Sequence, residues 1–445
     1  MTAAGPAALV AHGIGSREDL PLPLGWAIAG AASAVVLSFV LLALLWREPR
    51  LDAEKAGWPL PSGVARILDA PVFRRVLAGL GLAGAGYTLL ALLFGPEDAR
   101  NPVPWVVYVL VWVGLVPVSA LLGPVWRQVN PVRTLHALVN GAVGLDPRDG
   151  VRELPAALGW WPAAVGLFGF AWLELVSPDP AALSTLRWVI ALYTAVHLLA
   201  GLVYGSRWFD RGDAFEAWSG LYGKISPLGR READGVLVLR APLVGLDGVR
   251  VAPGLVATVA VLLGSTAYDG LSGSSAWARL TQSSGWSRQS AGTVGLAGTV
   301  LAIAAVFVVC SGIAGRVGGR SLPEAVGAFA PSVVPVALGY VVAHYYSFLV
   351  VEGQQAFVRL ADPLGIGANW LGTAHLQPSY ALVTPTIVAD VQVAAIVVGH
   401  VLGVVVAHDR AVKLFPRSKA VVGQIPLLVL MVTLTCLGLF LLFWD

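Results

Sequence analysis

Two apolar stretches decide the fold of this chain: residues 326–351, VGAFAPSVVPVALGYVVAHYYSFLVV, and residues 386–407, TIVADVQVAAIVVGHVLGVVVA. Each exceeds the roughly 20 mostly apolar residues that an α-helix needs to cross a bilayer. The first stretch carries His344, and the second carries Asp390 and His400. Because an ionisable side chain is costly to bury in hydrocarbon, such residues are candidates for a functional site. The two stretches therefore predict spanning helices that carry functional groups.

The composition of the whole chain also indicates a membrane protein. Of its 445 residues, 57% are hydrophobic and only 12% are charged, whereas a soluble domain has about 25% charged residues. This leaves too little polar surface for an exterior that faces water. The net charge of +3 gives no strongly basic surface, so we expect a lipid bilayer and no nucleic acid as partner.

Ten segments have the length and composition of spanning helices, which predicts an all-α polytopic transmembrane bundle. They are 24–46, 76–95, 103–123, 158–176, 184–204, 251–271, 293–313, 326–351, 386–407 and 420–444. Most of the 29 Lys and Arg residues lie in the connections after the first, third, fifth, seventh and ninth segments. Short basic connections stay in the cytoplasm. We therefore expect a multi-pass protein of the plasma membrane with both termini outside.

The longest cytoplasmic connection, 205–250, divides a single integral membrane domain into five helices over 1–204 and five over 251–445. Within it, apolar side chains recur at helical spacing, which predicts an amphipathic helix over 212–225 on the membrane surface. Residues 236–239 are typical of a short strand. Pro331 and Pro335 are expected to interrupt the eighth helix, because proline removes a backbone donor and kinks a helix.

Several ionisable residues fall in one layer near the outer surface. The helical rise of 1.5 Å per residue places Asp390 roughly 6 Å below that surface, His344 roughly 10 Å, and Asp269 and Glu174 roughly 3–5 Å. One interpretation is a polar cavity open to the outside, built by these four residues. The other is that Asp269 and Glu174 lie in hydrated headgroups, while His344 is bonded to a tyrosine hydroxyl.

Further side chains can join this predicted cavity. Tyr340 and Ser347 share the helix face of His344, and Glu352 lies at the rim. Carboxylates and imidazoles can hold a proton, a divalent metal or a cationic group. The metal-ligand candidates are His344, Asp390, His375 and His12.

A deeper layer holds His197 and His400, each roughly 20 Å from the outer surface. Three interpretations are open for this pair. The imidazoles can relay protons, they can ligate a b-type haem between facing helices, or they can form hydrogen bonds between helices.

Three functions follow from these patterns. The first is a transporter-like protein with an outward-facing polar cavity, linked to protons or a metal, that takes a small molecule or ion. The second is a membrane-embedded hydrolase of small apolar esters, with a metal-bound water as nucleophile. The third is a membrane subunit or anchor of a redox complex. The sequence has no G-x-S-x-G, H-E-x-x-H or C-x-x-C motif to decide among them.

Four groups of residues resemble a family of actinobacterial multi-spanning membrane proteins labelled fenitrothion-hydrolase-like. They are Ala11-His12-Gly13 with Arg17 and Asp19-Leu20-Pro21; Tyr204 with Trp208-Phe209-Asp210-Arg211-Gly212; Ser265-Thr266-Ala267-Tyr268-Asp269-Gly270; and His400 with Ala407-His408-Asp409-Arg410-Ala411. The label implies cleavage of an organophosphate ester. The chain lacks the histidine-rich metal-binding pattern of the soluble phosphotriesterases, so the resemblance supplies no mechanism.

Overall fold

The computed structural model describes residues 23–443, which form an all-α polytopic bundle, as the sequence predicts. Nine helical stretches within these residues are long and apolar enough to cross a membrane. They are α1 (Leu24–Leu45), α3 (Pro71–Phe94), η2 with α4 (Trp105–Leu122), α8 (Leu183–Tyr204), α12 (Leu255–Ser272), α14 (Arg288–Gly318), α15 to α16 (Leu322–Arg359), α17 (Pro385–Leu414) and η4 with α18 (Val422–Phe443).

The tenth predicted segment, 158–176, is the shorter helix α7 (Trp161–Leu175). Its 15 residues extend about 22 Å, which is less than the roughly 30 Å of a hydrocarbon core. It packs along α12, and the two helices run in the same direction. A hydrogen bond from the Trp160 N–H to the Pro253 carbonyl oxygen joins the residues that precede the two helices. A parallel pair brings the last turns of α7 and α12 to the same end of the bundle.

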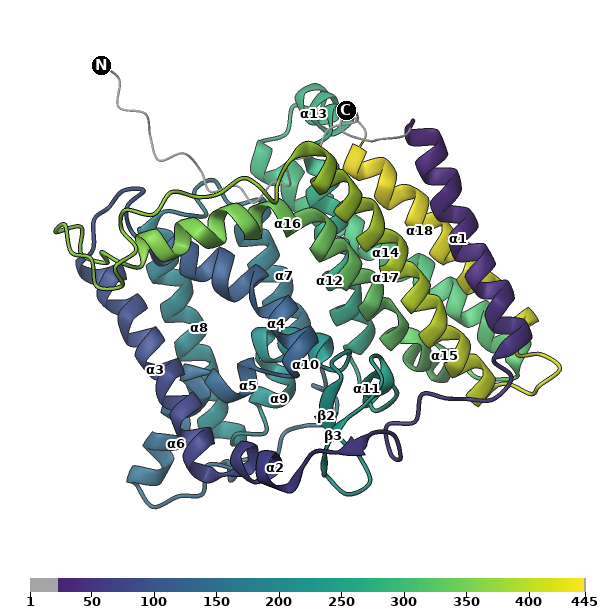
Figure 1. Cartoon of the computed structure of the whole chain (residues 1–445), viewed down its shortest axis with the longest axis horizontal. Helices are drawn as coiled ribbons and strands as arrows, with labels where there is room; N and C mark the ends of the chain where they lie inside the picture. Colours follow the sequence, from purple (N-terminus) through teal and green to yellow (C-terminus); the bar gives the residue numbers. More distant parts are fainter. Residues whose placement is uncertain (1–22, 444–445) are drawn as a thin grey trace.

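The two ends of the bundle differ (Figure 1). One end, here called the sheet end, carries an antiparallel sheet in the order β1-β3-β2 and most of the short helices. These elements are β1 (Trp58–Pro59), α2 (Ser62–Asp69), α5 (Trp126–Val129), α6 (Pro131–Ala142), α9 (Phe209–Gly212), α10 (Ala214–Gly223), β2 (Leu228–Arg230), β3 (Leu237–Leu239) and α11 (Val244–Asp247). Strand β3 confirms the strand expected over 236–239.

The opposite end, here called the α13 end, carries α13 (Ser275–Ser284) and the non-helical connection 360–384. Helix α1 begins at this end and α18 finishes at it (Figure 1). The described parts of the chain thus enter and leave the bundle on one side. That this side faces outward is a prediction from the basic residues, which lie mainly in connections at the sheet end.

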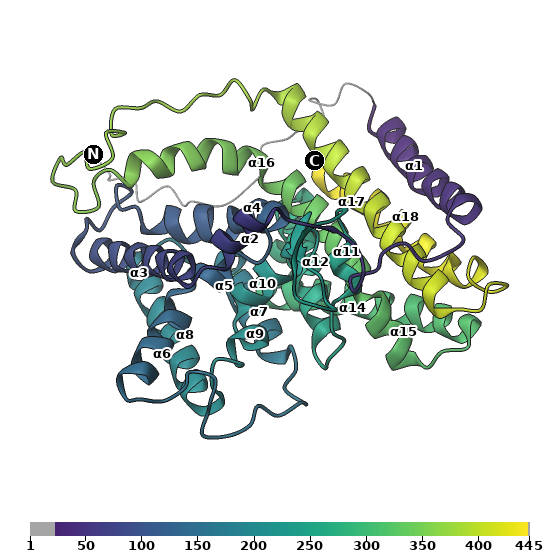
Figure 2. The same ribbon diagram turned by 60° about the horizontal axis from the view of Figure 1, so that its bottom comes forward.

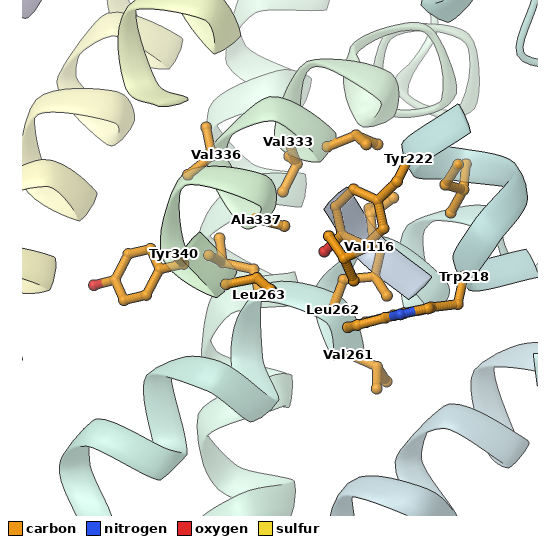
Figure 3. Close-up of a cluster of buried hydrophobic side chains, with 14 of the residues drawn as sticks. Val116, Trp218, Tyr222, Val261, Leu262, Leu263, Val333, Val336, Ala337 and Tyr340 are labelled. Atoms are coloured by element: carbon orange, nitrogen blue, oxygen red, sulfur yellow. The ribbon is translucent and has the colours of Figure 1, made fainter. Parts of the chain in front are cut away.

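Helices α12 and α16 occupy the centre and pack on each other; α12 also packs on α7 and α14, and α16 on η2 and α17. Figure 2 shows α3, α6 and α8 on one flank, with α1, α17 and α18 on the other. Apolar side chains from α4, α10, α12 and α16 interlock between them (Figure 3). Trp218 of α10 stacks on Trp112 of η2 with ring centroids 4.2 Å apart. This core fixes the positions of the central helices relative to each other.

Helix α10 forms where an amphipathic helix was expected, but its predicted place on the membrane surface is wrong. Eight of its residues are buried, including Trp218 and Tyr222. It packs against α4, α7 and α9 instead of lying on lipid. Periodic apolar residues indicate that a helix has an apolar face, and here protein rather than lipid covers that face.

The predicted interruption at Pro331 and Pro335 is present. Helix α15 (Leu322–Phe329) passes through a 3-10 turn, η3 (Ala330–Ser332), into α16 (Val333–Arg359). Beyond this break, α16 packs very closely on α17. A Cβ atom on Gly339 would lie only 2.4 Å from the Ala395 carbonyl oxygen. Glycine at this crossing lets the two backbones touch, as small residues do in membrane helix pairs.

Candidate functional site

The carboxylate of Asp269 and the imidazole of His344 meet inside the bundle. Nε2 of His344 lies 2.7 Å from Oδ2 of Asp269. Asp269 is 1% exposed and His344 is 7% exposed. Asp269 lies near the end of α12, and His344 lies in the middle of α16, which packs on α12. Two ionisable groups are therefore held together, away from water, within spanning helices.

Tyr345 and Glu174 extend this contact to a third helix. The buried hydroxyl of Tyr345 lies 3.1 Å from Oδ2 of Asp269 and 3.5 Å from Oε1 of Glu174. Glu174 is the second-last residue of α7, so the parallel packing of α7 on α12 delivers both carboxylates to one place. We call Glu174, Asp269, His344 and Tyr345 the acid–imidazole cluster.

A fourth element, η2 (Trp105–Val113), borders this cluster. It is a π-helix, in which the Gly114 N–H donates to the carbonyl oxygen of Val109 five residues earlier. The Trp112 indole of η2 lies next to Glu174 and Tyr345. π-Helical turns are rare, and many of them occur at functional sites.

The cluster is suited to holding one proton in several positions. Glu174 and Asp269 repel each other when both are ionised. The Tyr345 hydroxyl has one hydrogen, so it donates to one carboxylate at a time. A proton on Glu174 or on the imidazole of His344 relieves the repulsion. Protonation of one group is thereby coupled to the hydrogen bonds of the other three.

Three predicted cavity residues lie elsewhere. Asp390 is exposed on α17 and does not join His344. Glu352 accepts a hydrogen bond from Trp105 Nε1 at 2.8 Å, at the beginning of η2. Tyr340 is buried, and its hydroxyl lies against the position of Gly438 on α18. Of the four residues of the predicted cavity, the structure brings Glu174, Asp269 and His344 together and leaves Asp390 apart.

The predicted metal ligands are not brought together. Asp390 and His375 are exposed on α17 and in the connection 360–384, and His12 lies outside the described residues. The cavity candidate Ser347 is buried one turn after His344 on α16. Between residues 23 and 443 the structure gathers no group of three or more His, Cys, Asp or Glu side chains that could hold a metal ion.

His197 and His400 are far apart. Helices α8 and α17, which carry them, lie at opposite ends of the long axis in both views (Figures 1 and 2). His197 Nδ1 accepts a hydrogen bond from Trp208 Nε1 at 2.9 Å, and His400 Nδ1 donates to the Ile396 carbonyl oxygen at 2.8 Å. A haem cannot bridge these two imidazoles. Equal depth did not imply contact, because depth says nothing about lateral position.

Sequence reasoning missed Tyr345 as a site residue. It follows His344 directly, and neighbouring helical residues point about 100° apart, so the face of His344 did not include it. The feature of the sequence that could have predicted Tyr345 as a site residue is its place within a spanning segment, directly after His344. The burial of both side chains between α7 and α12 shows that one wide face of α16 supplies the cluster.

A second buried ionic network, nearer the sheet end, was also missed. Arg133 of α6 binds Glu216 of α10 through two contacts, Nη2 to Oε1 at 2.7 Å and Nε to Oε2 at 3.0 Å. Asp213 caps α10 and accepts a hydrogen bond from Tyr193 at 2.6 Å. Burial raises the pKa of the Glu216 carboxyl to about 7, although Arg133 opposes the shift. This network connects α6, α8 and α10.

The chain was compared with known proteins at the levels of family, sequence and structure. No family model matches it, and neither a curated protein nor a solved structure matches it at a significant level.

Proposed function

We propose that this protein is a proton-linked membrane transporter and that the acid–imidazole cluster is its proton-binding site. The observation that carries the proposal is the 2.7 Å contact between Asp269 and His344, buried within spanning helices. Intramembrane Asp, Glu and His side chains form the proton relays of many pumps and transporters. Because the four side chains come from α7, α12 and α16, binding of a proton to one of them changes the contacts between these three helices.

The proton step can be stated by atoms. In the proton-free form, the Tyr345 hydroxyl donates to Asp269, and Nε2 of His344 lies against the same carboxylate oxygen. An entering proton binds Nδ1 of His344 or a carboxylate oxygen of Glu174. The first choice creates an imidazolium paired with Asp269, and the second lets Glu174 donate to Tyr345. Either choice changes the interaction between α7, α12 and α16.

Two irregular elements support movement of these helices. The 3-10 turn η3 interrupts the stretch that leads into α16, and η2 is π-helical. Interrupted helices near a binding site are a feature of many secondary transporters. Because Asp269, His344 and Tyr345 are buried here, transport requires that the cluster open alternately to each side.

The test uses purified protein in liposomes that contain a pH-sensitive dye. A panel of organic cations, organic anions and sugars is added under an inward proton gradient. We expect one class to accelerate proton entry, and Asp269→Asn to reduce that entry at least about tenfold, as loss of a charged partner does. Asp390→Asn is the matched control, because Asp390 is exposed outside the cluster. Wild-type coupling in the Asp269→Asn protein would exclude the proposal.

A second candidate is ester hydrolysis, which the resemblance implies. The observation that favours it is that Asp269 orients the imidazole of His344 while buried Ser347 lies one turn further along α16. A serine, a histidine and a carboxylate are the parts of a nucleophilic site. A coloured p-nitrophenyl phosphotriester tests it. Turnover that disappears in Ser347→Ala would support hydrolysis, and release no faster than in buffer would exclude it.

A further inference from the structure

An apolar cleft of about 470 Å³ opens between the last turn of α12, the helix α13 and the first half of α14. Its walls include Trp277, Leu280, Trp286, Val294 and Gly298. The volume falls within the range of small-molecule sites, about 300–1,000 Å³. None of the residues that line it belongs to the acid–imidazole cluster.

One wall of the cleft is a helix long and apolar enough to cross a membrane. Helix α14 has 31 residues, so it is about 46 Å long and extends beyond a core of roughly 30 Å. Val294 and Leu301 are 54% and 67% exposed on this spanning helix, which directs its open face toward lipid chains. Gly298 lies between them, and a Cβ atom there would meet no protein atom within 4 Å. The floor of the cleft is therefore a gap in the helix surface on the lipid side.

One end of the cleft carries a positive charge. Arg288 at the start of α14 is exposed and lies one turn before the lining residue Ala291. Arg279 is also exposed, but it lies on the face of α13 opposite the lining residues Trp277 and Ser284. Residues 270–323 contain no Asp or Glu. Arg288 lies ten residues before Gly298, so the guanidinium is placed about 15 Å from the floor along the helix axis. This spacing separates a cationic end from an apolar floor, as a headgroup is separated from an acyl chain.

We propose that this cleft binds an anionic glycerophospholipid of the leaflet at the α13 end. One acyl chain fills the space over Gly298, and the headgroup phosphate pairs with Arg288. The aromatic rings of Trp277 and Trp286 cover the chain near the interface, where tryptophan is enriched. The site is independent of the proposed proton site, and it anchors α13 against α14.

The test compares lipid retention in protein taken from nanodiscs that contain equal amounts of phosphatidylglycerol and phosphatidylcholine. Native mass spectrometry counts the lipids of each kind that stay bound. The blocking variant is Gly298→Leu, because Gly298 lines the cleft and a Cβ atom there meets no protein atom within 4 Å. The matched control is Gly84→Leu on α3, an exposed helical glycine that also has no atom within 4 Å. The charge variant is Arg288→Gln, and its matched control is Arg279→Gln, because Arg279 lies on the face of α13 opposite the cleft.

We expect wild type to retain phosphatidylglycerol in preference to phosphatidylcholine. Gly298→Leu should remove the retained lipid, and Gly84→Leu should keep it. Arg288→Gln should lower the preference about fivefold, as loss of a basic residue near an anionic surface does, and Arg279→Gln should leave it unchanged. Unchanged retention in Gly298→Leu, equal loss in Gly84→Leu, or equal retention of the two lipids in wild type would each overturn the proposal.

Discussion

The Asp269 carboxylate lies 2.7 Å from the His344 imidazole at the packing contact of α12 and α16. Each side chain is buried, and each supplies the polar partner that the other cannot obtain from water. When one member of such a pair is removed, the remaining member becomes an uncompensated polar or charged group in a dry environment. The pair therefore links the stability of the two helices to the protonation of the site.

Replacement of Asp269 by alanine should strongly destabilise the protein. It removes the carboxylate that lies against His344 Nε2 and accepts a hydrogen bond from Tyr345, which costs about 3–5 kcal/mol for a broken buried pair. Asp269→Asn keeps a carbonyl oxygen in place and should cost clearly less. Equilibrium unfolding in mixed detergent and dodecyl sulfate micelles measures both values. A loss below about 1 kcal/mol in the alanine variant would contradict the structural role.

The close packing of α16 on α17 can be tested by replacing one glycine with alanine. In Gly339→Ala the new Cβ atom would meet the Ala395 carbonyl oxygen at 2.4 Å, so the helices must separate at a cost of about 1–3 kcal/mol. Gly353→Ala on the same helix is the control, because its Cβ has no neighbour within 4 Å. The same unfolding measurement should show a loss only at position 339. Equal stability of the two variants would mean that the helices do not pack as described.

The stability of the second network should depend on pH through Glu216. Burial raises its pKa to about 7 from 4.5, so the folded protein keeps a proton that the unfolded chain releases between these values. Unfolding stability therefore falls as the pH rises from about 4.5 to 7, by about 3 kcal/mol from this group. The side chain is 4% exposed, which keeps solvent screening small.

Comparison with Glu216→Gln isolates this group from others that titrate. The glutamine keeps the shape of the side chain but cannot release a proton. We expect the melting temperature of wild type to decrease relative to that of the variant between pH 5 and pH 8. Curves that stay parallel over this range would show that Glu216 has the same proton affinity in both states.

At the sheet end, Asp409 of α17 should hold the chain that follows α1. Its Oδ1 accepts hydrogen bonds from Trp46 Nε1 at 2.9 Å, from the Arg50 N–H, and from the Leu51 N–H at 3.2 Å. Asp409→Ala leaves three donors without this acceptor, at about 1–3 kcal/mol for each donor that stays buried. Hydrogen exchange at the amides of residues 50 and 51 should accelerate at least tenfold. Wild-type protection there would show that other contacts hold this segment.

Hydropathy predicted the spanning segments well because length and apolar composition are properties of the local sequence. It gave no warning that α7 has only 15 residues, since the apolar run continues into turns at both ends. The amphipathic pattern of α10 was also correct as a helix and wrong in location. The residues that cover its apolar face, such as Trp112, come from distant parts of the chain.

The predicted layer of ionisable residues also shows that sequence patterns do not give the contacts between helices. Counting helical rise placed Glu174, Asp269 and His344 at similar depth, and the structure brings these three together. The same count placed Asp390 beside them, but its side chain is exposed on α17. Rise fixes height along the membrane normal and leaves the direction of each side chain open. That direction depends on which helices are neighbours, which only the tertiary structure gives.

Infrared difference spectroscopy tests the proton-binding role of the acid–imidazole cluster without a known substrate. Purified protein in lipid is moved between acidic and alkaline pH, and the carbonyl stretch of a protonated carboxyl group is followed. We expect a wild-type band that disappears on deprotonation, that is lost or shifted in Glu174→Gln and Asp269→Asn, and that persists in Asp390→Asn. A band that is identical in all four proteins would show that the cluster does not exchange a proton.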